Sequence, residues 1–301
     1  MFEIIKYFNR YRKAYKNPFH MIFKIKWGKF PFMVQTLNSK KNVCITDHLM
    51  AYNISWYEYL GYSYSVEMNL VCIKEFRGRL NHPLIFYGAI HDGDLQGVFG
   101  QEIYGEFDYN GMTVLDIGAN IADSAIYFAL NGAKRVVALE PFPVTYDFAL
   151  RNVEANGFVD KITIINGGIG KVNEKISIPN NITSTGGLNA KQYGTGVQIE
   201  LFTLESIVKA FNFGSNSILK IDCEGCEYDV FNDTKDEILQ RFEYIMIEYH
   251  HGIDGLDARL SSLGFKVKVN YRNKGVGDIT AIKDPKHNIT VTSGHMASKY
   301  A

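Results

Sequence analysis

The chain has 301 residues, of which 46% are hydrophobic and 21% charged, a composition typical of an ordinary globular protein. Its 32 Lys and Arg residues balance 32 Asp and Glu residues, which argues against a chain built to bind nucleic acid. Four cysteines are too few for a disulfide framework and indicate a reducing compartment. Because no uncharged apolar run is long enough to cross a bilayer, we expect a cytoplasmic protein.

Positive charge is concentrated at the amino-terminal end of the chain. Residues 1–41 contain ten Lys or Arg and a single acid, Glu3. Within them, residues 1–16 show aromatic and basic side chains at helical spacing, up to Pro18. Such a helix either covers its own domain or lies on an anionic membrane surface, so residues 1–41 are a candidate for peripheral membrane contact.

An aromatic-rich region follows, which we interpret as an α+β accessory region. Its strand-like runs are 21–27, 32–37, 66–76 and 83–89, and a helix is predicted near 47–60. The aromatic side chains either pack a core or form a platform for a sugar ring. With the basic helix, this region makes up residues 1–95.

A β-α-β unit is predicted between Thr113 and Pro141. Its first strand carries Asp116 and breaks at Gly118-Ala119-Asn120, where the backbone can approach a ligand beside a helix start. Its second strand ends in Glu140-Pro141, where a carboxylate can bind a ribose diol. Residues 118, 120 and 123 are Gly, Asn and Asp, so the dinucleotide pattern G-x-G-x-x-G is absent. A nucleoside site of the kind that suits S-adenosylmethionine is therefore favoured over a nicotinamide site or a sheet without a ligand.

Further strands and helices alternate after this unit. The third strand ends at Asn166-Gly167, which we place at the edge of an adenine pocket, although such residues also make simple turns. The polar segment 180–196 is predicted to be a loop, either a lid or an idle segment. A fourth strand ends at Asp222-Cys223-Glu224, a fifth at Glu248-Tyr249-His250, and a hairpin follows. This pattern predicts a seven-stranded, doubly wound, Rossmann-like methyltransferase sheet.

Titratable side chains gather at the predicted ends of the fourth and fifth strands. His250 is our first candidate for a general base because the ordinary pKa of histidine is near neutrality. Asp222 or Glu224 either orients it or acts in its place, and Glu248 lies beside them. Alternatively, these carboxylates pair with Lys220, or the four side chains hold Mg²⁺. A zinc or redox role for Cys223-x-x-Cys226 is weaker, because a structural zinc needs four ligands.

Four ordered sequence blocks resemble the FkbM-type S-adenosylmethionine-dependent methyltransferases. They are VLDIGANIADSAIYFA, VVALEPFP, ILKIDCEGCEYDVF and IMIEYHHG, and the resemblance covers roughly residues 94–283. The chain departs from the family at Ala122, where glycine is usual, and at Cys223, where a small apolar residue is usual. The resemblance does not extend to the first 90 or so residues.

The resemblance implies methyl transfer from S-adenosylmethionine to a hydroxyl oxygen of a sugar, glycan or similar small molecule. It implies a methyltransferase domain at residues 96–283, and residues 284–301 read as a loose tail. The alternatives are a catalytically silent protein of the same fold, which would bind a partner or membrane, and a nicotinamide-dependent oxidoreductase.

Overall fold

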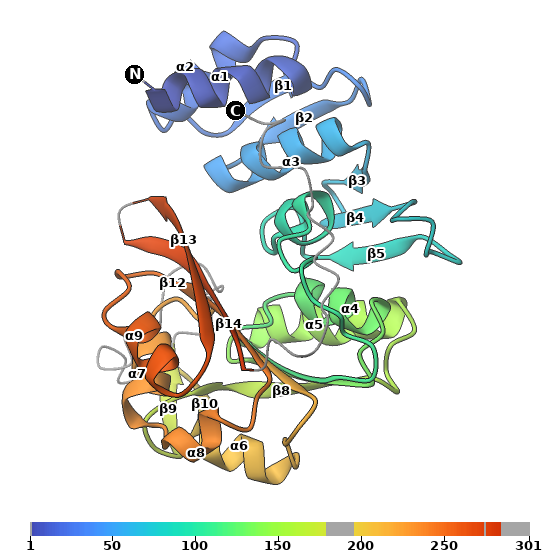
Figure 1. Ribbon diagram of the computed structural model, residues 1–301. Coiled ribbons are helices and arrows are strands. Elements are labelled where there is room, and N and C mark those ends of the chain that lie inside the picture. Colours follow the sequence, from blue (N-terminus) through green and yellow to red (C-terminus); the bar gives the residue numbers. More distant parts are fainter. Residues whose placement is uncertain (1, 179–195, 274, 284–301) are drawn as a thin grey trace. The chain divides into compact units, whose positions relative to one another are not determined.

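The computed structural model describes residues 2–178, 196–273 and 275–283, and the chain divides into two compact units, residues 1–103 and 104–301 (Figure 1). The sequence suggests a boundary at residue 95. The predicted lid segment 180–196 lies outside the described residues except for Gly196, and the predicted tail lies wholly outside them.

The first unit combines three α-helices with two small antiparallel sheets. Its elements are α1 (Phe2–Ala14), α2 (Pro18–Lys26), β1 (Phe32–Gln35), β2 (Asn42–Ile45), α3 (His48–Leu60), β3 (Ser63–Ser65), β4 (Leu70–Ile73), β5 (Leu84–Tyr87) and the π-helix η1 (Gln96–Gln101). Strands β1 and β2 form one sheet and β3, β4 and β5 the other. Asp47 starts α3 because its side chain accepts a hydrogen bond from the Met50 N–H (2.7 Å), and Gly61 ends it in the left-handed conformation.

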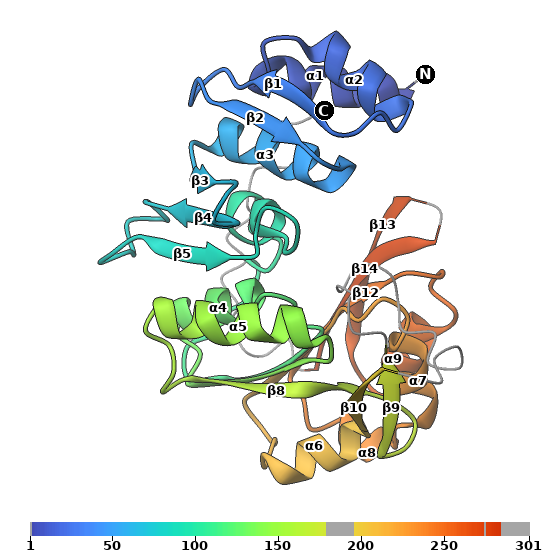
Figure 2. The ribbon, with the colours of Figure 1, turned by 180° about the vertical axis from the view of Figure 1, so that it is seen from behind.

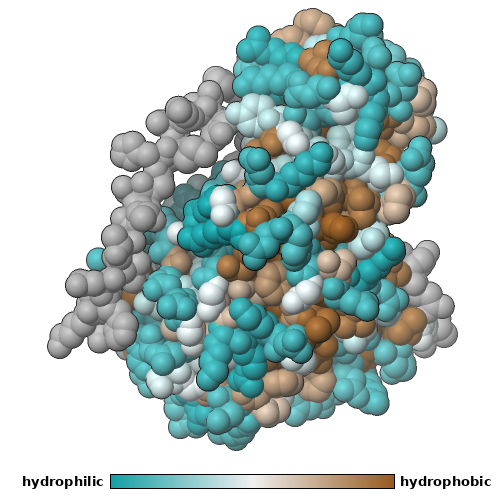
Figure 3. All heavy atoms as spheres, turned by 90° about the vertical axis from the view of Figure 1, so that its right-hand side faces the viewer, coloured by the Kyte–Doolittle hydropathy of each residue, from teal (hydrophilic) through white to brown (hydrophobic). Residues whose placement is uncertain are grey.

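Helix α1 packs against α3 through aromatic and basic side chains. Tyr11 and Tyr15 are buried, and the Tyr15 hydroxyl donates to the Ala51 carbonyl (2.7 Å). The Arg10 guanidinium lies over the Trp56 ring, 4.2 Å from its centroid. The described part of α1 therefore contributes to the core of its own unit. Figure 3 shows mainly hydrophilic residues at the top of the view, with isolated hydrophobic side chains among them.

The strand predicted at residues 21–27 is wrong, because this segment belongs to helix α2. Pro18 does not only stop the preceding helix but occupies the first turn of the next one, where its missing N–H costs nothing. A short apolar run fits a strand or a helix equally well, and the flanking proline decides in favour of the helix.

The second unit is an α/β domain. Its elements are β6 (Thr113–Ile117), α4 (Asp123–Leu130), β7 (Arg135–Glu140), α5 (Pro143–Ala155), β8 (Ile162–Ile169), β9 (Glu174–Ile178), β10 (Val197–Phe202), α6 (Leu204–Ala210), β11 (Ser217–Ile221), α7 (Glu227–Asp233), α8 (Asp236–Leu239), β12 (Tyr244–Tyr249), α9 (Leu256–Ser262), β13 (Lys266–Asn273) and β14 (Val276–Ile282). Strands β6, β7, β8, β11 and β12 alternate with helices, as the sequence predicts.

These strands form one nine-stranded sheet in the order β13-β14-β12-β11-β6-β7-β8-β10-β9. The strands from β12 to β10 run parallel, while β14 pairs antiparallel with both β12 and β13. Seven of the strands reproduce the predicted sheet with its terminal hairpin. The other two, β9 and β10, extend it beyond β8, because residues 174–178 and 197–202 pair with each other and β10 pairs with β8.

Helices cover both faces of this sheet. Figures 1 and 2 show α4 and α5 together on one face, and α6 and α8 on the other. Alternate residues of the central strands, such as Leu115, Leu219 and Ile245, pack with Leu204 of α6 and Leu260 of α9 in one buried cluster. Burial on both faces explains why the central strands are continuous apolar runs, and it leaves the ends of the strands as the place for polar side chains.

Candidate active site

The turn after β6 brings the backbone of two distant segments into contact. Gly118 has φ +77°, and a Cβ atom at this position would lie 1.7 Å from the Asp222 carbonyl oxygen. The Asp222 N–H donates to the Ile117 carbonyl (3.0 Å), so the end of β11 is held directly against the turn. Only glycine satisfies both the conformation and the space.

Ala122 starts α4 in the left-handed conformation, with φ +65°. This conformation costs a residue with a Cβ atom roughly 1–2 kcal/mol, and glycine avoids that cost. Alanine therefore adopts here the left-handed conformation that glycine adopts without that cost.

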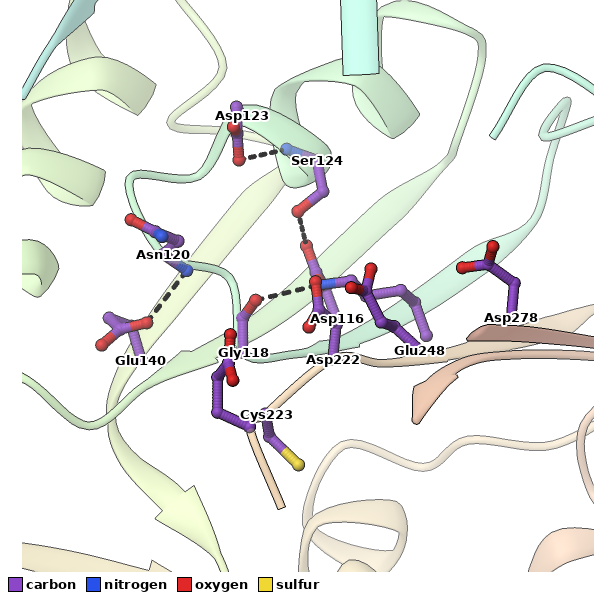
Figure 4. A network of polar contacts seen from close by, with 12 residues as sticks. Asp116, Gly118, Asn120, Asp123, Ser124, Glu140, Asp222, Cys223, Glu248 and Asp278 are labelled. Carbon is purple, nitrogen blue, oxygen red and sulfur yellow. Dashed lines mark hydrogen bonds and ion pairs between the residues drawn. The ribbon is translucent and has the colours of Figure 1, made fainter. Parts of the chain in front are cut away.

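Glu140 is buried at the end of β7, and its carboxylate binds the turn. The Asn120 N–H donates to Oε2 (2.9 Å) and the Phe142 N–H donates to Oε1 (3.0 Å). Figure 4 shows Glu140 facing Asn120 across this hydrogen bond. The carboxylate thus lines the cleft described below and also fixes the backbone on both of its sides.

Asp116 lies behind the turn, in a buried polar network. Ser124 Oγ donates to its Oδ2 (2.6 Å), and Lys220 Nζ lies 3.0 Å from its Oδ1 (Figure 4). Lys220 Nζ also donates to the Gly118 carbonyl (2.8 Å). Burial favours the neutral amine, but Asp116 and Asp222 raise the pKa of Lys220 above its ordinary value. The ion pair expected as an alternative was with a carboxylate of the Asp222 group; the main partner of Lys220 is instead Asp116, and Asp222 Oδ2 lies farther away, at 3.8 Å.

A cleft of about 970 Å³ opens beyond the carboxyl ends of the parallel strands. Of the predicted cofactor residues, those that line it are Gly118, Asn120, Glu140, Pro141 and Asp222, whereas Asp116, Ala119, Asn166 and Gly167 do not. Asn166 instead donates through Nδ2 to the Glu140 carbonyl (3.2 Å), so it stabilises the backbone of a residue that lines the cleft.

The sequence analysis missed one wall of this cleft. Ile169 of β8, Ile176 of β9 and Leu201 of β10 line it together with Leu139 and Phe142. The sequence signal for this wall is the alternation of apolar and polar residues in β9 and β10. Their place beside β8 follows only from the sheet pairing.

A second group of titratable side chains lies beyond β11 and β12. His250 Nε2 is 3.8 Å from Asp222 Oδ1, 3.6 Å from Glu224 Oε1 and 3.5 Å from Glu248 Oε1. The four predicted residues are therefore brought together. Asp222 and Glu224 line the cleft, and Glu248 and His250 do not. Figure 4 shows Asp222 and Glu248 close to each other beside the Gly118 turn.

Two further residues hold this group and were missed. Glu227, fully buried at the start of α7, lies with its Oε1 2.9 Å from His250 Nδ1. Arg272 of β13 binds Glu248 Oε2 (2.6 Å) and also pairs with Asp278 of β14. In the sequence Glu227 looks like an ordinary acid in a first helical turn, and Arg272 like an exposed strand residue.

The close packing of charges shifts the pKa of each member of this group. Burial raises the pKa of Asp222, the charge of Lys220 lowers it and the charge of Glu248 raises it, with a net value of about 7. Burial alone would raise the pKa of Glu248, but His250 and Arg272 bring it down to about 2. Burial lowers the pKa of His250, yet hydrogen bonding to Glu227 and Glu248 and the charge of Asp222 raise it to about 10.

Cys223 and Cys226 form a disulfide beside these residues, with a Cα–Cα distance of 5.5 Å. The sequence left a zinc or redox role for this pair open and indicated a reducing compartment, whereas the structure shows the two cysteines bonded to each other. Between them Glu224 adopts a left-handed conformation, with φ +55°. The bridge closes a short loop that carries Glu224, and Asp222 directly precedes it. Cys44 and Cys72 are free.

The strand order, the terminal antiparallel hairpin and the cleft at the carboxyl ends of the strands define a class I methyltransferase fold. The chain belongs to the FkbM methyltransferase family, since the model of the methyltransferase FkbM domain matches residues 116–267. No curated protein matches the chain.

Solved structures similar to this chain include three methyltransferases. The O-methyltransferase from Bacillus cereus in complex with SAH is 15% identical, with 64% of this chain and 83% of that chain covered and a TM-score of 0.40. The ribosomal protein L11 methylase from Lactobacillus delbrueckii subsp. bulgaricus is 13% identical, with 64% and 80% covered and a TM-score of 0.40. TrmK from M. capricolum, in complex with S-adenosyl-homocysteine, is 15% identical, with 62% and 68% covered and a TM-score of 0.37.

Among the described residues, no helix combines the length and the apolar character that a membrane span requires. Peripheral contact through residues 1–41 stays a prediction.

Proposed function

We propose that this protein transfers a methyl group from S-adenosylmethionine to a hydroxyl oxygen of a sugar, glycan or related small molecule. Membership of the FkbM methyltransferase family supports the reaction class. The main structural support is the cleft itself, in which a buried carboxylate, Glu140, adjoins the Gly118 turn at the carboxyl ends of adjacent parallel strands.

We place a nucleoside rather than a dinucleotide in the cleft, because the turn after β6 lacks the G-x-G-x-x-G pattern. Glu140 would hold the ribose, because its carboxylate lines the cleft at the carboxyl end of β7, where a carboxylate can accept hydrogen bonds from a ribose diol. Ile169, Ile176 and Leu201 would face the adenine with apolar surface. When bound, the cofactor supplies a sulfonium methyl group whose S–C bond breaks as the O–C bond forms, so that sulfur keeps the electron pair and becomes neutral.

The acceptor hydroxyl must lose its proton, and the carboxylates that line the cleft are placed to take it. The side chain of Glu224 is 49% exposed and that of Asp222 is 30% exposed, whereas His250 is 11% exposed and does not line the cleft. Both ring nitrogens of His250 also face carboxylates. We therefore assign the proton to Glu224 or Asp222, and we give His250 the role of orienting them.

Two glycine variants test the cofactor site. Gly118→Ala forces a Cβ atom into the Asp222 carbonyl, whereas Gly157→Ala, at φ +72°, meets no atom within 4 Å and carries only the conformational strain. Calorimetry with S-adenosylhomocysteine, NAD and NADP should show binding of S-adenosylhomocysteine alone. This binding should disappear in Gly118→Ala and persist in Gly157→Ala.

A transfer assay then tests the reaction. Wild-type protein incubated with labelled S-adenosylmethionine and cell glycan or lipid extracts should place label on an oxygen, detected by mass spectrometry as one added methyl. Binding of NAD instead of S-adenosylhomocysteine would refute the cofactor. Cofactor binding without transfer to any extract would favour the catalytically silent alternative.

A further inference from the structure

We propose that Asp222, Glu248 and His250 bind a divalent transition-metal ion such as Mn²⁺ beside the cleft, which Asp222 lines. The three residues come from the ends of two neighbouring parallel strands, because β11 and β12 pair up to Ile221 and Ile247. One ligand atom from each of them lies within 4.8 Å of the others. The inference deepens the proposed function, on which its role in methyl transfer rests.

The spacing of the three side chains leaves room for an ion between them. A charge-assisted hydrogen bond between imidazole and carboxylate spans about 2.7–2.9 Å. Here His250 Nε2 is 3.5 Å from Glu248 Oε1 and 3.8 Å from Asp222 Oδ1. Around an ion with bonds of about 2.0–2.2 Å, neighbouring ligand atoms lie about 3.0–3.6 Å apart. The contacts of Nε2 are thus longer than a charge-assisted hydrogen bond and closer to the spacing of ligands.

The opposite side of the imidazole is fixed by a buried carboxylate. His250 Nδ1 lies 2.9 Å from Oε1 of Glu227, whose side chain is fully buried. Oε2 of Glu227 is also buried and has no hydrogen-bond partner in the part of the chain that the structure describes. A histidine that binds a metal commonly donates its other N–H to such a carboxylate, which directs the remaining nitrogen at the ion. This contact distinguishes the group from a cluster of surface acids.

The two carboxylate ligands also have outer partners. Glu248 presents Oε1 to the site while its Oε2 binds Arg272 (2.6 Å). Asp222 presents Oδ1 while its Oδ2 faces Lys220 Nζ at 3.8 Å. Each of the two carboxylates therefore has an outer partner that fixes its orientation toward the site.

The donor set selects the metal. One imidazole nitrogen with two carboxylates suits Mn²⁺ or Fe²⁺ better than Mg²⁺, which prefers oxygen ligands alone. The bound ion would polarise the acceptor hydroxyl and lower its pKa, and the exposed carboxylate of Glu224 in the same cleft would take the proton.

Mn²⁺ titration of EDTA-dialysed full-length protein, followed by calorimetry and electron paramagnetic resonance, tests this site. We expect one Mn²⁺ per chain, with a nitrogen coupling from His250 in the spin-echo spectrum. Asp222→Asn should abolish binding, and Glu227→Gln should weaken it about 10–100-fold without removing a ligand. Glu154→Gln, an exposed acid on α5, is the matched control and should bind as wild type does.

The outcomes separate this proposal from the proposed function. Absence of stoichiometric Mn²⁺ binding, absence of the nitrogen coupling, or equal affinity in wild type and Glu227→Gln would overturn the metal site. The nitrogen coupling is measured on wild type, so it decides even when a variant fails to fold. If the wild-type protein does not bind S-adenosylhomocysteine, the methyltransferase proposal is refuted, whether or not Mn²⁺ binds.

A separate observation concerns helix α2, and from it we infer that this helix lies on an anionic lipid bilayer. Phe19, Phe23 and Trp27 follow each other at intervals of four residues, so they share one face. Their exposed fractions are 76%, 52% and 62%, while Met21 on the other face is fully buried in the unit. An exposed aromatic stripe on an anchored helix is typical of an interface.

Charge identifies the partner as an anionic surface. Lys29 Nζ lies 5.5 Å from the Phe23 ring centroid and Lys26 Nζ lies 5.8 Å from that of Trp27. The stripe is therefore flanked by ammonium groups, and residues 1–41 hold ten basic side chains against one acid. Aromatic rings at headgroup depth with lysines beside them match the chemistry of phosphatidylserine-containing bilayers.

Sedimentation with vesicles tests this face. The full-length protein should sediment with phosphatidylcholine vesicles that contain phosphatidylserine, far less with phosphatidylcholine alone, and less as salt rises. The double variant Phe23→Ser with Trp27→Ser should lose at least tenfold in partitioning. Met68→Ser removes an equally exposed hydrophobic residue (60%) elsewhere in the same unit and should change nothing. Equal sedimentation of both variants, or none of the wild type, would overturn the inference.

Discussion

Replacement of Glu140 by glutamine isolates the carboxylate at the centre of the proposed cofactor site. In the wild type its two oxygens accept one backbone N–H each, from Asn120 and Phe142. Glutamine has a single oxygen, so its amide group must face one of these donors. Leaving a buried donor unsatisfied costs about 1–3 kcal/mol, and we expect the free energy of unfolding of residues 104–301 to fall by that amount.

The same substitution should weaken the binding of S-adenosylhomocysteine. Hydrogen bonds to a charged group contribute about 1.5–3 kcal/mol, so the affinity should fall by about 10–150-fold. Both tryptophans, Trp27 and Trp56, lie in residues 1–103, so the unfolding of the second unit must be followed by circular dichroism. Calorimetry gives the affinity of the folded variant.

A neighbouring acid supplies the control for charge. Glu174 lines the same cleft but is exposed, so Glu174→Gln removes a negative charge without leaving a buried donor. We expect Glu174→Gln to change stability and affinity much less than Glu140→Gln does. Equal effects in the two variants would show that the net charge of the cleft matters and not the geometry at Glu140. Unchanged affinity in folded Glu140→Gln would remove this residue from the site.

Two further predictions concern stability. Lys220→Met should destabilise the second unit by about 3–5 kcal/mol in urea denaturation, because it leaves the buried Asp116 without its cation. The double variant with Asp116→Leu should recover part of this loss. A cost of Lys220→Met below about 1 kcal/mol would contradict the pairing. In the first unit, hydrogen bonding to His91 lowers the pKa of Asp47 from 3.8 to about 2. Because the folded-state pKa is depressed, the contribution of Asp47 is complete above pH 3.8 and is lost as the pH falls through about 2. Tryptophan fluorescence should therefore show a steeper acid loss of stability in wild type than in Asp47→Ser, and parallel curves would contradict this.

The sequence alone determined the second unit to a large extent. Its central strands are buried on both faces, so their sequences are continuous apolar runs, and the strands alternate regularly with helices. Chain direction then follows, because strands joined by helices run parallel and their carboxyl ends meet at one edge. For this reason Asp222 and His250, 28 positions apart in the chain, were expected at one place, and the family resemblance was confirmed.

Local patterns were less informative where two structures fit the same residues. The run at residues 21–27 suits a strand or a helix. Only the burial of Met21 in the folded unit shows that α2 buries one face and exposes the other. The wall of the cleft from β9 and β10 also escaped prediction, since which strand pairs with β8 is a matter of long-range contacts.

The tertiary structure alone decided the environment of the polar groups. Glu227 and Arg272 have ordinary sequence contexts, and their importance comes from the atoms that they face, His250 Nδ1 and Glu248 Oε2. The ordinary pKa of histidine suggested a base, but a pKa depends on burial and on charges within a few ångströms, which the sequence does not specify. The chain thus encodes its strands and helices locally, whereas the charge, exposure and partners of each site residue arise only when the ends of β11 and β12 come together with α7 and β13.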